Sequence, residues 1–255
     1  MLAIERRNAI LAKLSVEGKV LVSDLSREFN VTEETIRRDL EKFDKDGLAR
    51  KTYGGAVKNE NLNIDLPFHV RKQTNVQSKR RIAAKIGEMI HDGDYVMLDS
   101  STTALYVIQN ILDRKKITLI TNSIEILIEL CNKPDWMIIS TGGVLKDGGL
   151  SLVGYQAERM VKGFHVDIAI CSCKGLDPDM GITDSNECDS EIKKSFFHSA
   201  KKKVLAVDGS KFDKASFVKV CGISEINAVV TDSDPGEKWR DIIDNAGVDL
   251  ILANK

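Results

Sequence analysis

The sequence predicts an α/β chain of two domains, a small helical domain and a larger one built on a parallel sheet. Helix-like segments occupy most of residues 3–43, and two short strand-like runs follow them. From Tyr95 onward, short apolar runs alternate with helix-length segments, the pattern of buried parallel strands covered on both faces. The 255 residues are enough for two cores. We expect the domains to span residues 1–58 and 75–255, with an Asn-rich linker at 59–74 that Pro67 interrupts.

The small domain reads as three helices. The first runs from Ala3 to Glu17, and the second is a short helix up to Phe29 that Ser23 is expected to cap. Asn30 suits a tight turn, because Asn tolerates the left-handed region. The third helix follows Thr32, a good N-cap residue, and Gly47 is expected to end it.

The third helix has one apolar and one polar side. Ile36, Leu40 and Phe43 recur at i, i+4 and i+7 and form an apolar stripe. A short helix, a turn and a second helix are the order of a helix-turn-helix, whose second helix reads the major groove. The alternative for this helix alone is a solvated amphipathic helix.

A small hairpin is expected after the third helix. Leu48–Val57 contains two strand-like pieces bent at Gly54-Gly55, which makes a wing able to touch phosphate or the minor groove. The candidate DNA-binding residues of helices and wing are Ser23, Thr32, Glu34, Thr35, Arg37, Arg38, Lys42, Arg50, Lys51 and Tyr53.

Charge gives no general affinity for nucleic acid. The net charge is −1, and residues 1–58 carry 12 Lys plus Arg against 10 Asp plus Glu, which is +2. DNA affinity must therefore come from locally placed cations, and it should fall steeply with salt.

The larger domain begins with an expected long helix, Arg71–His91, on which Arg71, Asn75 and Lys79 share one face. Leu66 and Phe68 are expected to anchor the linker to this domain. The expected strands are Tyr95–Leu98, Ile117–Ile120, Trp136–Ile139, Val166–Ile170, Lys203–Val207 and Ala228–Val230, with Val248–Leu252 as an edge strand.

Polar residues follow several of these strands. Ligands of parallel sheets bind beyond the carboxyl ends of the strands, and a helix N-terminus there holds anions. The pattern therefore predicts a site for a phosphorylated small molecule, without a cofactor. The candidate effector-binding residues are Arg71, Lys79, Asp99, Ser100, Ser101, Thr102, Thr103, Gly142, Gly143, Lys174, Glu187, Asp208 and Lys211.

The five cysteines are odd in number and lack disulfide spacing, which fits a reducing cytoplasm. Cys171-x-Cys173 is more typical of packing than of a metal site, and a thiol sensor is a further alternative. No signal peptide is expected at Met1–Arg7, and no apolar run reaches the ~20 residues of a membrane span.

Two sets of motifs resemble the DeoR family of bacterial transcriptional regulators. The first set is Thr35-Ile36-Arg37-Arg38-Asp39-Leu40, Gly47-Leu48, Arg50 and Gly54-Gly55-Ala56; the second is Asp99-Ser100-Ser101-Thr102-Thr103, Thr141-Gly142-Gly143, Val153-Gly154 and Ser210-Lys211. Tyr53, Ser101 and Lys174 depart from the residues usual in the family, which are His, Gly and a small residue.

The resemblance implies a winged helix-turn-helix and a sensor domain similar in fold to ribose-5-phosphate isomerase and CoA transferases. It also implies a regulator, a repressor of a carbohydrate operon controlled by a phosphorylated sugar that it binds without turnover. Its expected partners are a double-stranded DNA operator, a phosphorylated metabolite and further copies of the chain, since a palindromic operator requires two-fold symmetry.

The alternative function is a sugar-phosphate isomerase that carries a DNA-binding domain. Such an enzyme needs a base beside a carbonyl and a cation for the enediolate. Glu187 or Asp184 could serve as the base, and Lys174 or Lys211 as the cation.

Overall fold

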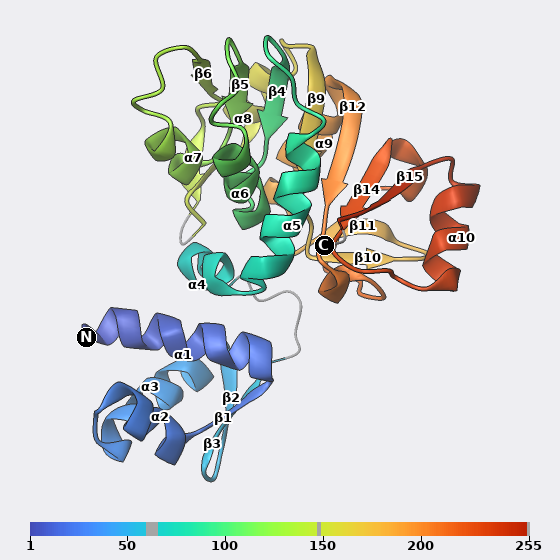
Figure 1. The fold of residues 1–255 in the computed structure, drawn as a ribbon. Helices are drawn as coiled ribbons and strands as arrows, with labels where there is room; N and C mark the ends of the chain where they lie inside the picture. The colour runs from blue at the N-terminus through green and yellow to red at the C-terminus, as the bar shows by residue number, and fades with distance from the viewer. Residues whose placement is uncertain (60–65, 147–148, 254–255) are drawn as a thin grey trace. The chain divides into compact units, whose positions relative to one another are not determined.

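The computed structural model describes residues 1–59, 66–146 and 149–253. These residues form two compact units, Met1–Val76 and Gln77–Lys255, each with its own core (Figure 1).

The first unit is built on three helices, α1 (Ala3–Glu17), α2 (Val22–Phe29) and α3 (Glu33–Lys45). Each helix contributes apolar side chains to one shared core. Ile10 of α1, Leu25 of α2 and Leu40 of α3 are at most 1% exposed. The apolar spacing of the sequence therefore predicted these helices and their buried faces.

Most helix ends have the predicted residues, but Ser23 was wrongly predicted as a cap. Gly47 after α3 has φ +69°, and Thr32 accepts the N–H of Thr35 at 3.3 Å. The second helix begins at Val22, so Ser23 lies inside its first turn. The Val22 N–H donates to Gly54 O at 2.9 Å, so a wing carbonyl accepts from the first N–H group of the helix.

The wing hairpin belongs to a three-stranded antiparallel sheet in the order β1-β3-β2. Its strands are β1 (Lys19–Leu21), β2 (Ala49–Thr52) and β3 (Gly55–Lys58). Gly55 lies against β1, and a Cβ added there would be 1.9 Å from Val20 O. Glycine is thus required for the close pairing of β1 and β3.

A short helix, α4 (Phe68–Gln73), completes the first unit. It lies against α1, and both Val70 and the half-buried Leu66 pack into the core of this unit. The expectation that Leu66 anchors to the larger domain was therefore wrong.

The long helix expected at Arg71–His91 is interrupted. Asn75 has φ +50°, and α5 (Val76–Gly87) begins after it. Thr74 and Asn75 both form helices poorly, and Asn adopts the left-handed region more readily than most residues. Arg71 and Lys79 therefore do not share one helical face.

The second unit is organised around a seven-stranded parallel sheet in the order β15-β14-β12-β9-β4-β5-β6. The strands are β4 (Tyr95–Leu98), β5 (Thr118–Thr121), β6 (Met137–Ser140), β9 (Val166–Cys171), β12 (Ala200–Ala206), β14 (Ala228–Thr231) and β15 (Asp249–Leu252). All seven coincide with predicted apolar runs to within a few residues, and β15 is an edge strand as expected.

Helices cover both faces of this sheet. Figure 1 shows α5 and α6 (Thr102–Asn110) in front of it, and α8 (Tyr155–Val161) and α9 (Glu187–His198) behind. Further helices are α7 (Ile124–Glu129) and α10 (Glu237–Asn245), with short 3-10 turns η1 (Gly209–Lys211) and η2 (Ile223–Glu225). The α/β class predicted from the sequence is confirmed.

Two antiparallel additions had no sequence prediction. The hairpin β7 (Val144–Lys146) and β8 (Ser151–Val153) follows β6, and a separate sheet contains β10 (Gly175–Asp177), β11 (Gly181–Asp184) and β13 (Val218–Cys221). These strands have only three or four residues, too few for a period-2 pattern to be recognised.

Candidate DNA-binding face and effector site

The polar side of α3 is open to solvent. Arg37 pairs with Glu33 at 2.5 Å, and Arg38 pairs with Glu34 at 3.3 Å with 77% of its side chain exposed. Exposed pairs at this spacing contribute little to stability. The two guanidinium groups can therefore exchange a carboxylate for a DNA phosphate or base at small cost.

The first unit has a buried ion cluster that the sequence analysis missed. Asp39 is 1% exposed and accepts from Arg6 Nε and Arg7 Nε, each at 2.7 Å. The cluster fixes α1 against α3 and so holds α3 in place. The sequence gives no signal for it, since the partners are more than 30 residues apart.

The wing is fixed to α3 by a hydrogen bond from Lys51 N–H to Asp44 Oδ1 at 2.8 Å. Arg50, Lys51 and Tyr53 are exposed, and Tyr53 is completely so. All ten predicted DNA-binding residues lie on α2, at the N-cap of α3 or within α3, or in the wing. Nine of them are exposed, and Thr35 is half-buried. Their DNA contacts stay predictions.

The predicted effector loops follow β4, β6, β9 and β12. Because these strands are parallel, their carboxyl ends meet at one edge of the sheet. The loop after β9 lies between those after β12 and β4, as the strand order requires. We call this edge the effector edge.

Asp99 joins two of these loops. It is fully buried; Oδ1 accepts the Ser101 N–H at 3.0 Å, and Oδ2 accepts the Ser172 N–H at 2.9 Å. The Ser101 hydroxyl caps α6 by accepting the Ala104 N–H at 3.1 Å. Asp99 and Ser101 therefore shape the loop.

The first helical residues of α6 are Thr102 and Thr103, each 4% exposed. The backbone N–H groups of these two residues have no acceptor within the helix, because they lie in its first turn. They can therefore donate to an anion. Ser100 is half-buried beside them.

The two predicted glycines have different roles. Gly142 has φ +62°, and a Cβ there would meet nothing within 4 Å, which leaves open space beside the backbone. At Gly143 a Cβ would be 2.6 Å from Val153 O of the β7–β8 hairpin. Gly143 is therefore needed for packing, and Gly142 is the better candidate for close approach to a ligand.

The structure brings Lys79, Asp208 and Lys211 together. Asp208 begins η1 and accepts hydrogen bonds from Ser210 N–H and hydroxyl. Burial alone would raise the pKa of Asp208, but Lys211, the Ser210 hydrogen bonds and Lys79 hold it below its ordinary value. Lys79 is buried and Lys211 half-buried, so cationic charge is concentrated at this end of the edge.

A second buried ion cluster contains Lys193, which the sequence analysis did not single out. Its Nζ pairs with Asp184 Oδ2 and lies 3.6 Å from Asp99 Oδ2. Burial alone would lower the pKa of Lys193, but Asp184, Asp99 and Asp189 raise it well above its ordinary value. Lys193 stays charged behind the loop that Asp99 shapes. Its α9 sequence reads like a solvated charged face, which is why it was missed.

The remaining predicted effector residues are Arg71, Glu187 and Lys174. Arg71 belongs to the first unit, where its Nε donates to Leu66 O at 3.0 Å. Glu187 is exposed at the start of α9. Lys174 is half-buried, and its charge helps to lower the pKa of Asp184.

The cysteine alternatives find no support in the geometry. Burial raises the pKa of Cys171 well above its ordinary value and that of Cys173 to about 12, so both remain protonated thiols of low reactivity. Within the described residues, no group of three or more His, Cys, Asp or Glu side chains is placed to hold a metal ion.

A winged helix-turn-helix unit joined to a parallel-sheet unit with an anion-suited edge defines a DNA-binding regulator that carries its own sensor. Residues 6–61 match the DeoR-like helix-turn-helix domain, and residues 74–233 match the DeoR C terminal sensor domain. The chain belongs to the DeoR family of transcriptional regulators, and the resemblance of its motifs to this family is confirmed.

Relatives align over nearly the whole chain. An uncharacterized HTH-type transcriptional regulator of Bacillus subtilis, YulB, is 39% identical over 91% of this chain and 90% of its own. The L-fucose operon activator of Haemophilus influenzae is 32% identical over 89% and 91%, and the Escherichia coli glycerol-3-phosphate regulon repressor is 28% identical over 97% and 98%.

Among solved structures, ribose 5-phosphate isomerase A of Methanocaldococcus jannaschii matches with a TM-score of 0.41 and 17% identity, over 55% of each chain. A likeness this small adds nothing to the assignment of function. Within the described residues, no helix has the length and apolar character needed to cross a membrane.

Proposed function

We propose that the chain regulates genes of carbohydrate metabolism as a repressor, reading operator DNA with α3 and the wing. Two of the relatives are named as regulators of fucose and glycerol-3-phosphate genes, which supports this target class. The observation that carries the DNA-reading role is the exposed polar side of α3, held from behind by the Asp39 cluster. A palindromic operator needs two such helices, so the active form is a homodimer or a higher oligomer in the cytoplasm, where operator DNA lies.

The test of this role is Arg38→Ala, with Lys45→Ala as the matched control. Both residues form exposed ion pairs on α3, but Lys45 lies in its last turn. If Arg38 reads a base, its loss should cost about 1–3 kcal/mol of affinity and relax preference at one position. The assay is fluorescence anisotropy with duplexes selected from a random pool. Equal affinities of the Arg38→Ala protein and the wild type would refute the assignment.

The effector is a phosphorylated sugar or a related metabolite that binds at the effector edge. The supporting observation is that the α6 N-terminus, the open backbone at Gly142 and the cations Lys79 and Lys211 all lie at one edge of the sheet. Helix N–H groups and lysines both favour a phosphate. Hydroxyls beside them suit the sugar.

A thermal-shift screen of phosphorylated sugars, each paired with its unphosphorylated parent, tests the ligand class. Thr102→Val keeps the side-chain shape but removes the hydroxyl, so binding of the ligand found should weaken about tenfold or more. Thr118→Val, at the amino end of β5, is the control. Normal ligand binding by the Thr102→Val protein would place the effector elsewhere.

The chain is proposed to bind its effector without turnover. Of the two candidate bases of the isomerase alternative, Glu187 is exposed at the start of α9, whereas Asp184 is 1% exposed and paired with Lys193. Burial alone would raise the pKa of Asp184, whereas Lys193 lowers it below its ordinary value, which makes it a poor base. An isomerase assay on pentose and hexose phosphates should give no turnover above buffer.

A further inference from the structure

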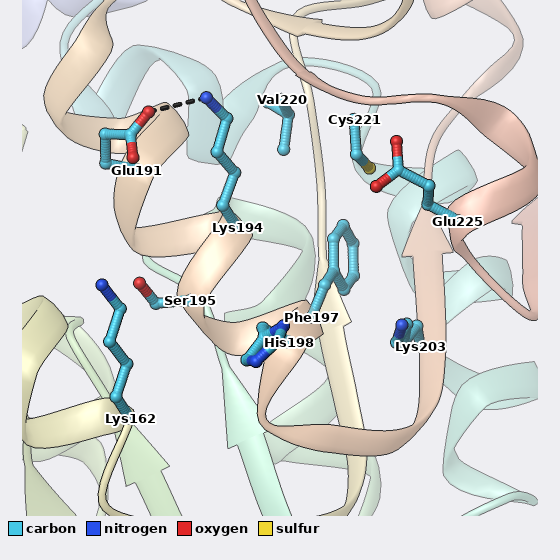
Figure 2. Close-up of a pocket in the computed structure, with 10 residues that line it drawn as sticks. All are labelled: Lys162, Glu191, Lys194, Ser195, Phe197, His198, Lys203, Val220, Cys221 and Glu225. Carbon is cyan, nitrogen blue, oxygen red and sulfur yellow. Dashed lines mark hydrogen bonds and ion pairs between the residues drawn. The ribbon is translucent and has the colours of Figure 1, made fainter.

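A second hollow lies away from the effector edge (Figure 2). It has a volume of about 400 Å³, within the ~300–1,000 Å³ range of small-molecule sites. Its walls come from α9, from Lys162 after α8, from Lys203 of β12, and from β13 and η2. Lys203 precedes Asp208 by five residues of extended chain, which separates the hollow from the effector edge by roughly 16 Å.

The charges around the hollow are unevenly paired. Lys194 pairs with Glu191 at 2.6 Å, as the dashed line in Figure 2 marks, and Glu225 accepts the Gly222 N–H at 2.6 Å. The side chains of Lys162, Lys203 and His198 have no hydrogen bond or ion pair to other described residues. Three lysines against two glutamates leave one excess positive charge.

The floor of the hollow is apolar. Phe197 and Val220 are at most 4% exposed, and burial raises the pKa of the Cys221 thiol to about 12, so it stays uncharged. Figure 2 shows the Phe197 ring between Cys221 on one side and Ser195 on the other, with Lys162 and Lys203 on opposite sides of His198. An apolar floor between two separated cations suits a short carbon chain with charges at its ends.

We propose that this hollow is a second ligand site that binds a small organic anion with two or more negative groups. Lys162 and His198 hold one anionic group and Lys203 holds the other, while the carbon chain lies over Phe197 and Val220. A monoanion engages only one end of this arrangement.

Citrate is the probe, and acetate at equal ionic strength is the monoanion control. Calorimetry of the full chain should show citrate binding and no acetate binding. The double variant Lys162→Gln/Lys203→Gln removes both charges and leaves polar side chains that are one bond shorter. Citrate affinity should fall about tenfold or more, since charge-assisted hydrogen bonds are the strong ones.

Lys202→Gln is the matched control. Lys202 is exposed and adjacent to Lys203, but successive side chains of a strand point to opposite faces, so it does not line the hollow. The affinity of the Lys202→Gln protein for citrate should stay within about twofold of that of the wild type.

Four results would overturn the proposal: no citrate binding by the wild type, equal binding of acetate, full binding by the double variant, or an equal loss in Lys202→Gln. If citrate binds at the effector edge instead, the double variant will bind it as well as the wild type does, which is the third of these results. Unchanged melting temperatures establish that the variants are folded.

Discussion

Replacing Lys193 with methionine should destabilise the second unit. Methionine keeps an unbranched side chain of similar length but removes the ammonium that lies beside Asp184 and 3.6 Å from Asp99. Both carboxylates are at most 1% exposed, so neither can recover its lost partner from water.

The cost follows from this burial. Removing one partner of a buried ion pair typically costs about 3–5 kcal/mol, because an uncompensated charge remains in the interior. At roughly 2–4 °C per kcal/mol for a unit of this size, the melting temperature should fall by roughly 6–20 °C.

The loss should also depend on pH. In the wild type the pKa of Asp184 is lowered in the folded state. The carboxylate therefore adds to the free energy of unfolding above the unfolded pKa of about 3.9, and this stabilisation is lost as pH falls through the folded pKa. In the variant, burial without Lys193 raises that pKa, so the penalty develops as pH rises above about 4. The difference between the two proteins should therefore be larger at pH 8 than at pH 5.

Tryptophan fluorescence is the assay, because Trp136 and Trp239 are the two tryptophans of the chain and both lie in the second unit. Lys194→Met is the control; Lys194 forms a half-exposed pair with Glu191 and should cost at most about 1 kcal/mol. A Lys193→Met protein as stable as this control, or one whose loss is the same at pH 5 and pH 8, would refute the reasoning.

Three further predictions concern the first unit. Gly55→Ala should disrupt the wing, since the added Cβ would be 1.9 Å from Val20 O. The variant should have a lower melting temperature by circular dichroism and a lower affinity for DNA; a wild-type melting curve would contradict this. Asp39→Asn should cost about 3 kcal/mol or more, measured by urea unfolding, because two arginines lose a buried carboxylate; a smaller effect than that of an exposed Asp→Asn change would count against it. Arg50→Ala/Lys51→Ala should weaken all DNA sequences alike and reduce the salt slope by about 2; an unchanged slope would remove the wing from the interface.

The parts of the fold predicted from sequence are those governed by local patterns. The i, i+4, i+7 spacing of Ile36, Leu40 and Phe43 defined the buried face of α3, and the continuous apolar run Tyr95–Leu98 defined a central strand. The effector edge followed from one rule, that the carboxyl ends of parallel strands meet at one edge.

The parts that could not be predicted depend on partners distant in the chain. Asp39 and Lys193 look like members of solvated charged faces, and only the folded chain brings Asp39 to Arg6 and Lys193 to Asp99. At Asn75 a local pattern was extended too far. Arg71 and Lys79 were predicted to share one helical face, but Asn75 between them adopts φ +50° and interrupts the helix. Ser23 was a good cap by residue type, but α2 begins one residue earlier, at Val22, so Ser23 lies inside the helix.

The coupling between effector and DNA tests the central claim most directly. Anisotropy titrations would measure the affinity of the wild type and of Thr102→Val for a selected operator duplex, with and without the sugar phosphate found in the screen. The ligand should change the wild-type affinity by about fivefold or more. Thr102→Val should bind DNA normally without ligand and lose that response at the same ligand concentration. A full response in Thr102→Val would contradict the account.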